Sequence, residues 1–515
     1  MPTVMAASER TSWLVIGWVG ACAVLVANAW QSLETVVDDA YISARYASHA
    51  ASGSGLVYNA GEPAIEGYTN LLWTLWLTMA KVVGIHVHTA MVGGGLFFGC
   101  VALGFVTLLG AHLAGRPHPA VLAAPFALAL DPHFAVVSTN GLETAQFIAA
   151  VTGACWVALV TPDRFRVVAG FFLGAAAAVR PEGVVVGALL VGADLWRRRT
   201  AWRDASTWRL AWPMIATWLV LQGFRLWTYG AMAPNTHAAK GARPLDALFK
   251  SHYAYVKPDL EFWVVLGILL LAAPWFGPRR PARLTVAMVA LATLAISLTV
   301  NLWMPGGRLF MPAVALTVAM WAGTAAAVGP WARGGIATVL VGGALVALTG
   351  SIGTHVRRYD SVHSVLRKNG TERAAKHLRR NLPAGSWLAT RDAGTLAHYV
   401  GPDVAVAELH DRALTQLHPD GAPAQVREYT PINPEVIALT VARVDKKAPK
   451  YANDRLIFRR TTEPYVYLGR VEQHYHRFYD YYVRADLELP PFPANIVVNR
   501  AGWKPPARRE APQSR

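Results

Sequence analysis

Residues 13–30 read WLVIGWVGACAVLVANAW, and residues 38–47, shortly after them, read DDAYISARYA. The first stretch is apolar over nearly the length that crosses a membrane, about 20 residues. The second begins with two adjacent carboxylates, Asp38 and Asp39, at the mouth of that helix. Charged groups beside a bilayer cost desolvation energy, so such a pair indicates a function. The two stretches together predict a membrane protein with its chemistry at one surface.

The composition is that of a polytopic α-helical membrane protein. Hydrophobic residues make up 54% of the 515-residue chain and charged residues only 16%, whereas a soluble domain carries about 25% charged residues. The net charge of +16 gathers in a few arginine-rich loops, which is typical of topology signals and not of a nucleic-acid site. The three cysteines offer neither a zinc spacing nor a disulfide framework.

About eleven stretches are apolar enough to be membrane spans. They are residues 13–30, 88–113, 119–136, 143–160, 166–180, 182–196, 210–229, 260–276, 284–303, 309–328 and 334–352. Two places stay open. Segment 68–84 can either span or lie at the interface. Segment 166–196 is too long for one upright helix and carries Arg180 and Pro181 at its middle, which favours two short helices.

Arginine-rich loops predict the orientation. Residues 196–209 hold five arginines and one aspartate, and residues 277–283 hold three arginines. Such loops face the cytoplasm. Counting spans from them places Asp38 and Asp39 on the outer face of the cytoplasmic (inner) membrane, which the multi-pass chain crosses. If 68–84 spans and 166–196 is one helix, the loop at 137–142 moves inside.

Three regions follow from the changes in composition. Residues 1–353 form the multi-span catalytic domain, residues 354–494 form a small extracytoplasmic α/β domain, and residues 495–515 form a basic tail predicted to be disordered. Within the second region, the pattern predicts a helix at Thr371–Asn381 and strands at Trp387–Thr390, Val404–Ala407 and Val436–Val441.

Asp38 and Asp39 are the candidate catalytic residues. A carboxylate can take the proton of an attacking hydroxyl, and its neighbour can bind the acceptor or a divalent cation, Mg²⁺ or Ca²⁺. The structural alternative is a pair of N-cap residues for a helix over 40–50.

The other outer loops offer binding groups. Arg180 at a helix break suits a phosphate, or it pairs with Glu182. Arg308 follows Pro-Gly-Gly in a phosphate cradle or a tight turn. Glu143 either stabilises a helix start or binds the acceptor or a metal. The remaining candidates for contacts with sugar or phosphate are Arg45, Glu66, Tyr68, Asn70, Asn235, His237 and Lys240.

Seven motifs in order resemble the GT-C membrane glycosyltransferases that use polyprenyl-phosphate sugars. The nearer likeness is to the actinobacterial terminal arabinofuranosyltransferases. The motifs are DDAYISARYA (38–47), GLVYNAGEPAIEGYTNLLW (55–73), NGLET (140–144), AAVRPEG (177–183), APNTHAAK (233–240), MPGGRLFMPA (304–313) and ATRDAG (389–394). The resemblance implies a GT-C-like fold, an aspartate of the Asp38–Asp39 pair as the catalytic carboxylate, and a donor phosphate held by Arg180, Lys240 and Arg308.

The predicted function is transfer of a sugar, with arabinofuranose favoured, from a polyprenyl phosphate to a hydroxyl of a bacterial cell-envelope glycan. The predicted partners are the lipid-linked donor, the glycan acceptor and the bilayer, with no nucleic acid. A lipid-sugar flippase would also use intramembrane charge and a broken helix. A non-enzymatic envelope scaffold is the third alternative, and it would tolerate substitution of the aspartate pair.

Overall fold

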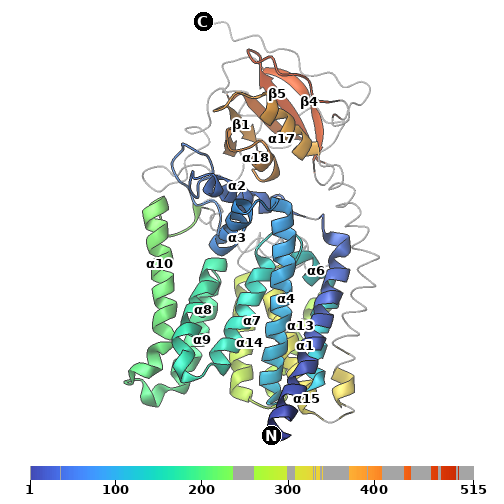
Figure 1. Cartoon of the computed structure of the whole chain (residues 1–515), viewed down its shortest axis with the longest axis vertical. Coiled ribbons are helices and arrows are strands. Elements are labelled where there is room, and N and C mark those ends of the chain that lie inside the picture. Colours follow the sequence, from blue (N-terminus) through green and yellow to red (C-terminus); the bar gives the residue numbers. More distant parts are fainter. Residues whose placement is uncertain are drawn as a thin grey trace.

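The chain folds into a body of helices with a small α/β unit above it (Figure 1). The computed structural model describes residues 2–34, 36–235, 260–297, 308–328, 330, 332–336, 339, 370–390, 393–408, 434–441, 465–473, 477–493 and 497. His237, Lys240, most of the predicted span 334–352 and nearly all of the predicted tail lie outside these residues. We call the helices of residues 2–339 the helical body and residues 370–497 the C-terminal unit.

Most of the predicted spans form helices. The long helices of the body are α1 (Pro2–Ala29), α4 (Val87–Ala114), α7 (Thr144–Val160), α10 (Ala211–Tyr229), α13 (Leu260–Ala272), α14 (Arg280–Ser297) and α15 (Met311–Ala327). Helix α4 packs against α1, α7 and α15, and buried aliphatic side chains such as Leu103, Ile148 and Leu316 fill the contacts. This packing puts α4 at the centre of the body.

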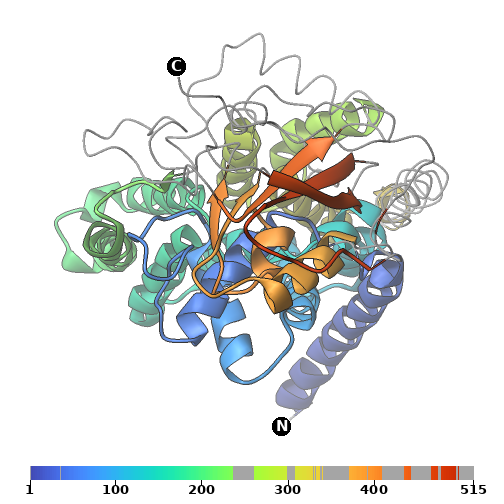
Figure 2. The same ribbon diagram turned by 90° about the horizontal axis from the view of Figure 1, so that it is seen from above.

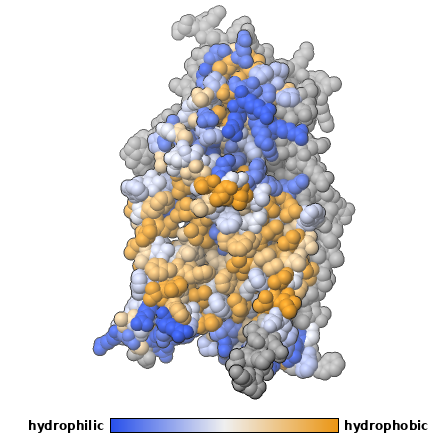
Figure 3. Space-filling model, viewed as in Figure 1, coloured by the Kyte–Doolittle hydropathy of each residue, from blue (hydrophilic) through white to orange (hydrophobic). Residues whose placement is uncertain are grey.

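The outer surface of the helical body is apolar, as a lipid-facing surface must be. Ile16 on α1 is 71% exposed and Val220 on α10 is 73% exposed. On the face shown in Figure 3, apolar residues form a broad band across the body, with hydrophilic residues gathered toward its two ends. Exposed tryptophans lie near both borders of this band, for example Trp227 (88%) toward one end of the molecule and Trp196 (70%) toward the other. Tryptophan favours the membrane–water interface, so the band marks the bilayer.

Three described helices are long and apolar enough to cross a membrane: Ser12–Ala29 within α1, α4 and α14. Shorter apolar helices accompany them. The predicted span 119–136 is one place where the prediction was wrong. A 3-10 turn (Pro119–Leu122), α5 (Ala123–Leu130) and α6 (Pro132–Val137) replace it. Asp131 accepts the His133 N–H (2.8 Å) and starts α6, because proline fits only the first turn of a helix.

The ambiguous segment 68–84 forms α3 (Leu71–Val82), a helix of 12 residues. At about 1.5 Å per residue, α3 is about 18 Å long, too short to cross a bilayer. It packs beneath α2 (Ala40–Ala51) at the end of the body nearest the C-terminal unit (Figure 1). The interfacial alternative is therefore the correct one for this segment.

The break predicted at Arg180 is present. Helices α8 (Arg166–Val179) and α9 (Gly183–Arg197) form a hairpin, and Arg180–Glu182 make the turn between them. Each helix has 14 or 15 residues, about 21 Å, whereas the hydrocarbon core is about 30 Å thick. The turn therefore lies lower in Figure 1 than the upper ends of α4 and α10.

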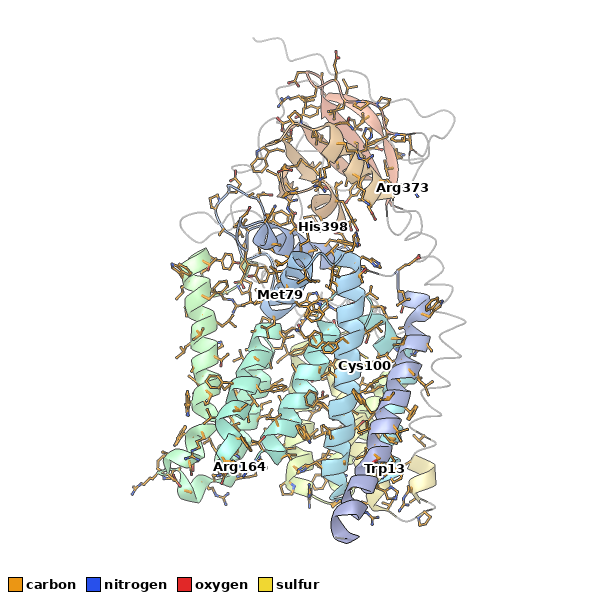
Figure 4. All side chains as sticks on the ribbon, in the orientation of Figure 1. Trp13, Met79, Cys100, Arg164, Arg373 and His398 are labelled. Carbon is orange, nitrogen blue, oxygen red and sulfur yellow. The ribbon has the colours of Figure 1, made fainter. Side chains whose placement is uncertain are left out.

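The arginine-rich end of the body is more than a topology signal. Arg164 and Trp13 both lie near this end, far from the C-terminal unit (Figure 4). Arg283 there is fully buried. Its guanidinium donates to the Pro278 carbonyl (2.8 Å), the Met320 carbonyl (2.9 Å) and the Thr324 hydroxyl (2.8 Å). One arginine thus neutralises the carbonyl-rich end of α15 and joins it to α14.

Replacing Arg283 with methionine should lower the free energy of unfolding by about 3 kcal/mol, because several buried acceptors would lose a charged donor. Thermal unfolding of the purified protein in detergent measures the change. Arg280→Met is the matched control, since Arg280 is exposed and lies 4.1 Å over the Trp275 ring. Equal unfolding midpoints for the two variants would show that Arg283 is not a structural residue.

The C-terminal unit is a five-stranded sheet in the order β2-β1-β3-β5-β4. Its strands are β1 (Trp387–Thr390), β2 (Ala405–Glu408), β3 (Val436–Val441), β4 (Tyr465–Gln473) and β5 (Arg477–Arg484). The first three pair in parallel, and β3–β5 and β5–β4 pair antiparallel. Helices α17 (Gly370–Asn381) and α18 (Thr395–Tyr399) cover one face. Viewed from above, the sheet lies over the helical body (Figure 2). The predicted helix and three strands are all present, within one residue at each end.

Candidate active site

Arg180 is at the centre of a buried ion cluster. Its Nη2 and Nε donate to the two carboxylate oxygens of Glu182 (2.7 and 3.2 Å), and its Nη1 donates to Glu143 Oε1. Arg180 is 8% exposed and Glu143 is 3% exposed. The predicted pairing of Arg180 with Glu182 is present, and Glu143 is a second partner. Two carboxylates therefore face this guanidinium, and phosphate binding by Arg180 stays a prediction.

A chain of hydrogen bonds joins this cluster to the first loop. Asn70, at the start of α3, donates to Glu143 Oε2 (2.8 Å). The side-chain amide oxygen of Asn70 accepts from the hydroxyls of Ser43 on α2 (3.1 Å) and Thr74 (3.2 Å). Glu143 occupies the N-cap position of α7 without a capping hydrogen bond from its side chain, so its carboxylate serves the cluster and not the helix. The predicted residues Asn70, Glu143 and Arg180 thus meet.

Arg308 joins the site from the turn before α15. Together with Arg180, Glu182 and the hydroxyl-bearing Ser297, it lines a small pocket. The negative charges of Glu143, Asp39 and Glu182 all act on its guanidinium. Arg308 therefore connects the ion cluster electrostatically to one member of the aspartate pair.

The two adjacent aspartates have different surroundings. Asp38 Oδ1 accepts the backbone N–H of Thr395 (2.8 Å), and its Oδ2 accepts that of Gly394 (3.2 Å). Asp39 occupies the N-cap position of α2 but makes no capping hydrogen bond with its side chain. The N-cap explanation is therefore wrong for α2, and Asp38 instead caps α18 in the C-terminal unit. Asp39 is the member whose charge reaches Arg308.

Arg45 has a structural position, and its predicted role in sugar binding stays a prediction. Its side chain is 1% exposed. The guanidinium donates to the carbonyls of Tyr58 (2.7 Å), Val404 (2.8 Å) and Gly401 (3.1 Å), as well as to that of Ala397. Burial lowers the pKa of this guanidinium. With its donors committed to protein carbonyls, Arg45 joins the first loop to the C-terminal unit.

Glu66 and Tyr68 lie side by side under the first loop. Glu66 Oε1 accepts from Arg225 Nε (3.0 Å), and the Tyr68 hydroxyl lies 2.9 Å from that of Tyr229. Burial raises the pKa of the Glu66 carboxyl, although Arg225 opposes the shift. The second carboxylate oxygen, Oε2, is buried and has no hydrogen-bond partner among the residues that the structure describes. Glu66 and Tyr68 are both buried beneath the first loop, and their predicted contacts with a sugar stay a prediction.

Arg225 and Tyr229 are the residues that the sequence analysis missed. Both lie on α10, one helical turn apart, and Arg225 is 5% exposed. The available signal was an arginine inside an otherwise apolar span, which marks a paired or functional residue. Asn235, a predicted sugar contact, lies nearby and donates its backbone N–H to the Glu66 carbonyl (3.0 Å).

A bound cation stays a prediction. In the part of the chain that the structure describes, no three or more His, Cys, Asp or Glu side chains gather as a metal site. The Asp38 carboxylate is held by two backbone N–H groups, and cation binding by Asp38 or Asp39 stays a prediction.

No protein-family model matches the chain. It is similar to the terminal β-(1→2)-arabinofuranosyltransferase of Mycobacterium tuberculosis (strain H37Rv), with 30% identity over 299 residues. The match covers 52% of this chain and 45% of that protein, so the chain spans less than half of the length of this relative.

Two solved structures share the fold. ArnT from Cupriavidus metallidurans bound to undecaprenyl phosphate has a TM-score of 0.56 at 15% identity, over 93% of this chain and 99% of that one. The Archaeoglobus fulgidus oligosaccharyltransferase tethered to an acceptor peptide has a TM-score of 0.54 at 10% identity, over 88% and 72%. The chain is thus a polytopic helical membrane protein with the GT-C fold. The resemblance seen in its motifs is confirmed.

Proposed function

We propose that the protein is a membrane glycosyltransferase that takes a sugar from a polyprenyl-phosphate donor. The observation that carries the proposal is a cluster of buried charges, in which Arg180 bonds Glu143 and Glu182, and the charges of Glu143 and Asp39 act on Arg308. A transfer of this kind needs a base for the acceptor and cations for the leaving phosphate. Both are present in one place, at the end of apolar helices.

The depth of the pocket supports a lipid-linked donor. The α8–α9 turn, which begins at Arg180, lies lower than the upper ends of α4 and α10 (Figure 1). A phosphate carried on a polyprenyl chain can approach such a turn from within the bilayer, between the apolar helices. The fold shared with ArnT bound to undecaprenyl phosphate agrees with such a donor.

The chemistry follows from the charges. The acceptor oxygen forms a bond to the anomeric carbon while its proton moves to Asp39. The bond from that carbon to the donor phosphate breaks, and the phosphate oxygen keeps the electron pair. Arg308, whose guanidinium is acted on by the negative charges of Glu143, Asp39 and Glu182 and by the positive charge of Arg180, stabilises the charge that grows on the phosphate. Lys240, outside the described residues, is proposed to assist in the same role.

The proposed sugar is arabinofuranose and the proposed acceptor is a hydroxyl of a cell-envelope glycan. The similarity to the mycobacterial arabinofuranosyltransferase supports both. The arginine-rich ends of the helices lie opposite the C-terminal unit (Figure 4). By the positive-inside rule, the site and the C-terminal unit then face outward from the cytoplasmic membrane.

The test is transfer by the protein in nanodiscs with a panel of polyprenyl-phosphate sugars and short arabinan, galactan and mannan acceptors. We expect release of polyprenyl phosphate and a lengthened acceptor with the arabinofuranose donor, only when the acceptor is present. EDTA, followed by added Mg²⁺ or Ca²⁺, tests the predicted cation. Movement of intact lipid-sugar across liposomes without cleavage of any donor would instead establish the flippase.

A further inference from the structure

The first loop and the C-terminal unit are joined by two oppositely charged side chains at the two ends of α18. Asp38 accepts the N–H groups of Gly394 and Thr395, where α18 begins. Arg45 donates to the Ala397 and Gly401 carbonyls, where α18 ends. A carboxylate at a helix start and a guanidinium at a helix end both suit the backbone dipoles. We call these contacts the α2–α18 clamp.

Neighbouring residues strengthen the clamp. The Asn59 side chain accepts the Val406 N–H (2.9 Å) and donates to the Val406 carbonyl (3.0 Å), as a neighbouring strand would. The Tyr58 hydroxyl donates to the Ala393 carbonyl (2.8 Å). The Tyr41 ring lies 5.5 Å from that of His398, centroid to centroid. His398 lies at the junction of the two parts (Figure 4).

The protonation of His398 fits this surrounding. Burial, together with the nearby charge of Arg45, lowers the pKa of His398 to about 3. The ring is therefore neutral at physiological pH and does not repel Arg45. The two charged groups of the clamp are the Arg45 guanidinium and the Asp38 carboxylate. The guanidinium faces backbone carbonyls, and the carboxylate faces backbone N–H groups.

The aspartate pair is held from both sides. On the side of the helical body, the backbone N–H of Val37 donates to the Asn140 carbonyl (3.0 Å). On the other side, the C-terminal unit holds the Asp38 carboxylate. Asp39 is the next residue, so its backbone can rotate little without breaking one of these contacts.

Gly394 shows how tightly the two parts meet. A Cβ atom built at this position would overlap the Asp38 carbonyl oxygen and lie 2.5 Å from Asp38 Oδ2. Gly394 has a φ of −91°, which is outside the left-handed region. Glycine is required here because a larger residue would collide with Asp38.

We propose that Gly394 and Thr395 of the C-terminal unit are positioning residues of the catalytic site, which act on Asp39 through Asp38. The inference rests on the proposed function. In this view the C-terminal unit is part of the catalytic apparatus, although it does not touch the reacting atoms. Loss of the contacts between the C-terminal unit and the Asp38 carboxylate lowers turnover. It leaves the binding of the lipid donor unchanged, because Arg180 and Arg308 belong to the helical body.

The decisive variant is Gly394→Ala, compared with the wild type in the nanodisc assay. We expect kcat to fall about 10- to 100-fold, since a displacement near 1 Å at a reacting group has this effect. The KM for the lipid donor should stay within about twofold, because the pocket is untouched. The control is Ile437→Val, which removes a methylene from a buried position of β3. It should lower the unfolding temperature without changing kcat.

A double-mutant cycle separates positioning from general damage. If Gly394→Ala acts by displacing Asp39, adding it to Asp39→Asn should reduce kcat little further, whereas independent effects multiply. Undiminished kcat in Gly394→Ala, or effects that multiply in the cycle, would overturn the inference while wild-type transfer upheld the proposed function. A wild-type protein that transfers no sugar from any donor would overturn the function, and the inference with it.

Discussion

Replacing Asp39 with asparagine should lower kcat by about 10²- to 10⁴-fold, the usual contribution of a general base. Asparagine keeps the size of the side chain but cannot take a proton. Asp39 is the better candidate of the pair because its side chain does not cap α2 and its charge reaches Arg308 at the pocket. Acceptor-dependent release of polyprenyl phosphate is the measurement.

Asp38→Asn is the matched comparison, one residue away. Its amide oxygen can still accept one of the two N–H groups from α18, so we expect a loss of only about tenfold, in proportion to one weakened hydrogen bond to a charged group. The unfolding temperature of the Asp39 variant should equal that of the wild type. A larger loss of kcat in Asp38→Asn than in Asp39→Asn would reverse the assignment of base and positioning residue.

Replacing Arg180 with methionine should lower the free energy of unfolding by about 3–5 kcal/mol, the cost of leaving a buried ionic partner unpaired. Glu143 and Glu182 would then face each other in a buried site without the guanidinium that now bonds both. Thermal unfolding in detergent measures the effect. Transfer activity should be lost as well, because Glu143 also orients Asn70 (2.8 Å).

The control for Arg180→Met neutralises the two acids at the same time. Glu143→Gln with Glu182→Gln, added to Arg180→Met, should restore most of the lost stability, since no unpaired charge stays buried. It should not restore transfer. An Arg180→Met protein as stable as the wild type would mean that the two carboxylates are already protonated or solvated, and that the ion cluster is not a structural unit.

Much of the helical body could be predicted from local sequence. A run of apolar residues predicts a helix in a membrane because every backbone group must be paired within the segment. The break at Arg180-Pro181 was predictable for the same reason, since proline removes a hydrogen bond and a buried arginine needs a partner. The span over 119–136 was wrong because Asp131-Pro132 starts a new helix there.

The partners of the site residues could not be predicted in this way. Arg45 looked like a sugar contact because its loop is polar, yet its acceptors at Ala397, Gly401 and Val404 lie about 350 residues further along the chain. Likewise, the pairing of Glu66 with Arg225 depends on where α10 ends against the first loop. The order of the motifs indicated which residues lie near one another. Only the tertiary packing decides which of their side chains are already paired with other groups of the protein.

The α2–α18 clamp also has a consequence for biosynthesis. Asp38 and Arg45 leave the ribosome early, and the carbonyl and amide groups that receive them are made some 350 residues later. Until then, no partner from the C-terminal unit exists for the Arg45 guanidinium, and it must stay hydrated at the membrane surface. Asp38 and Arg45 are therefore set in place late. If the proposed function holds, a nascent chain already inserted in the membrane would transfer no sugar until its synthesis had passed Val406.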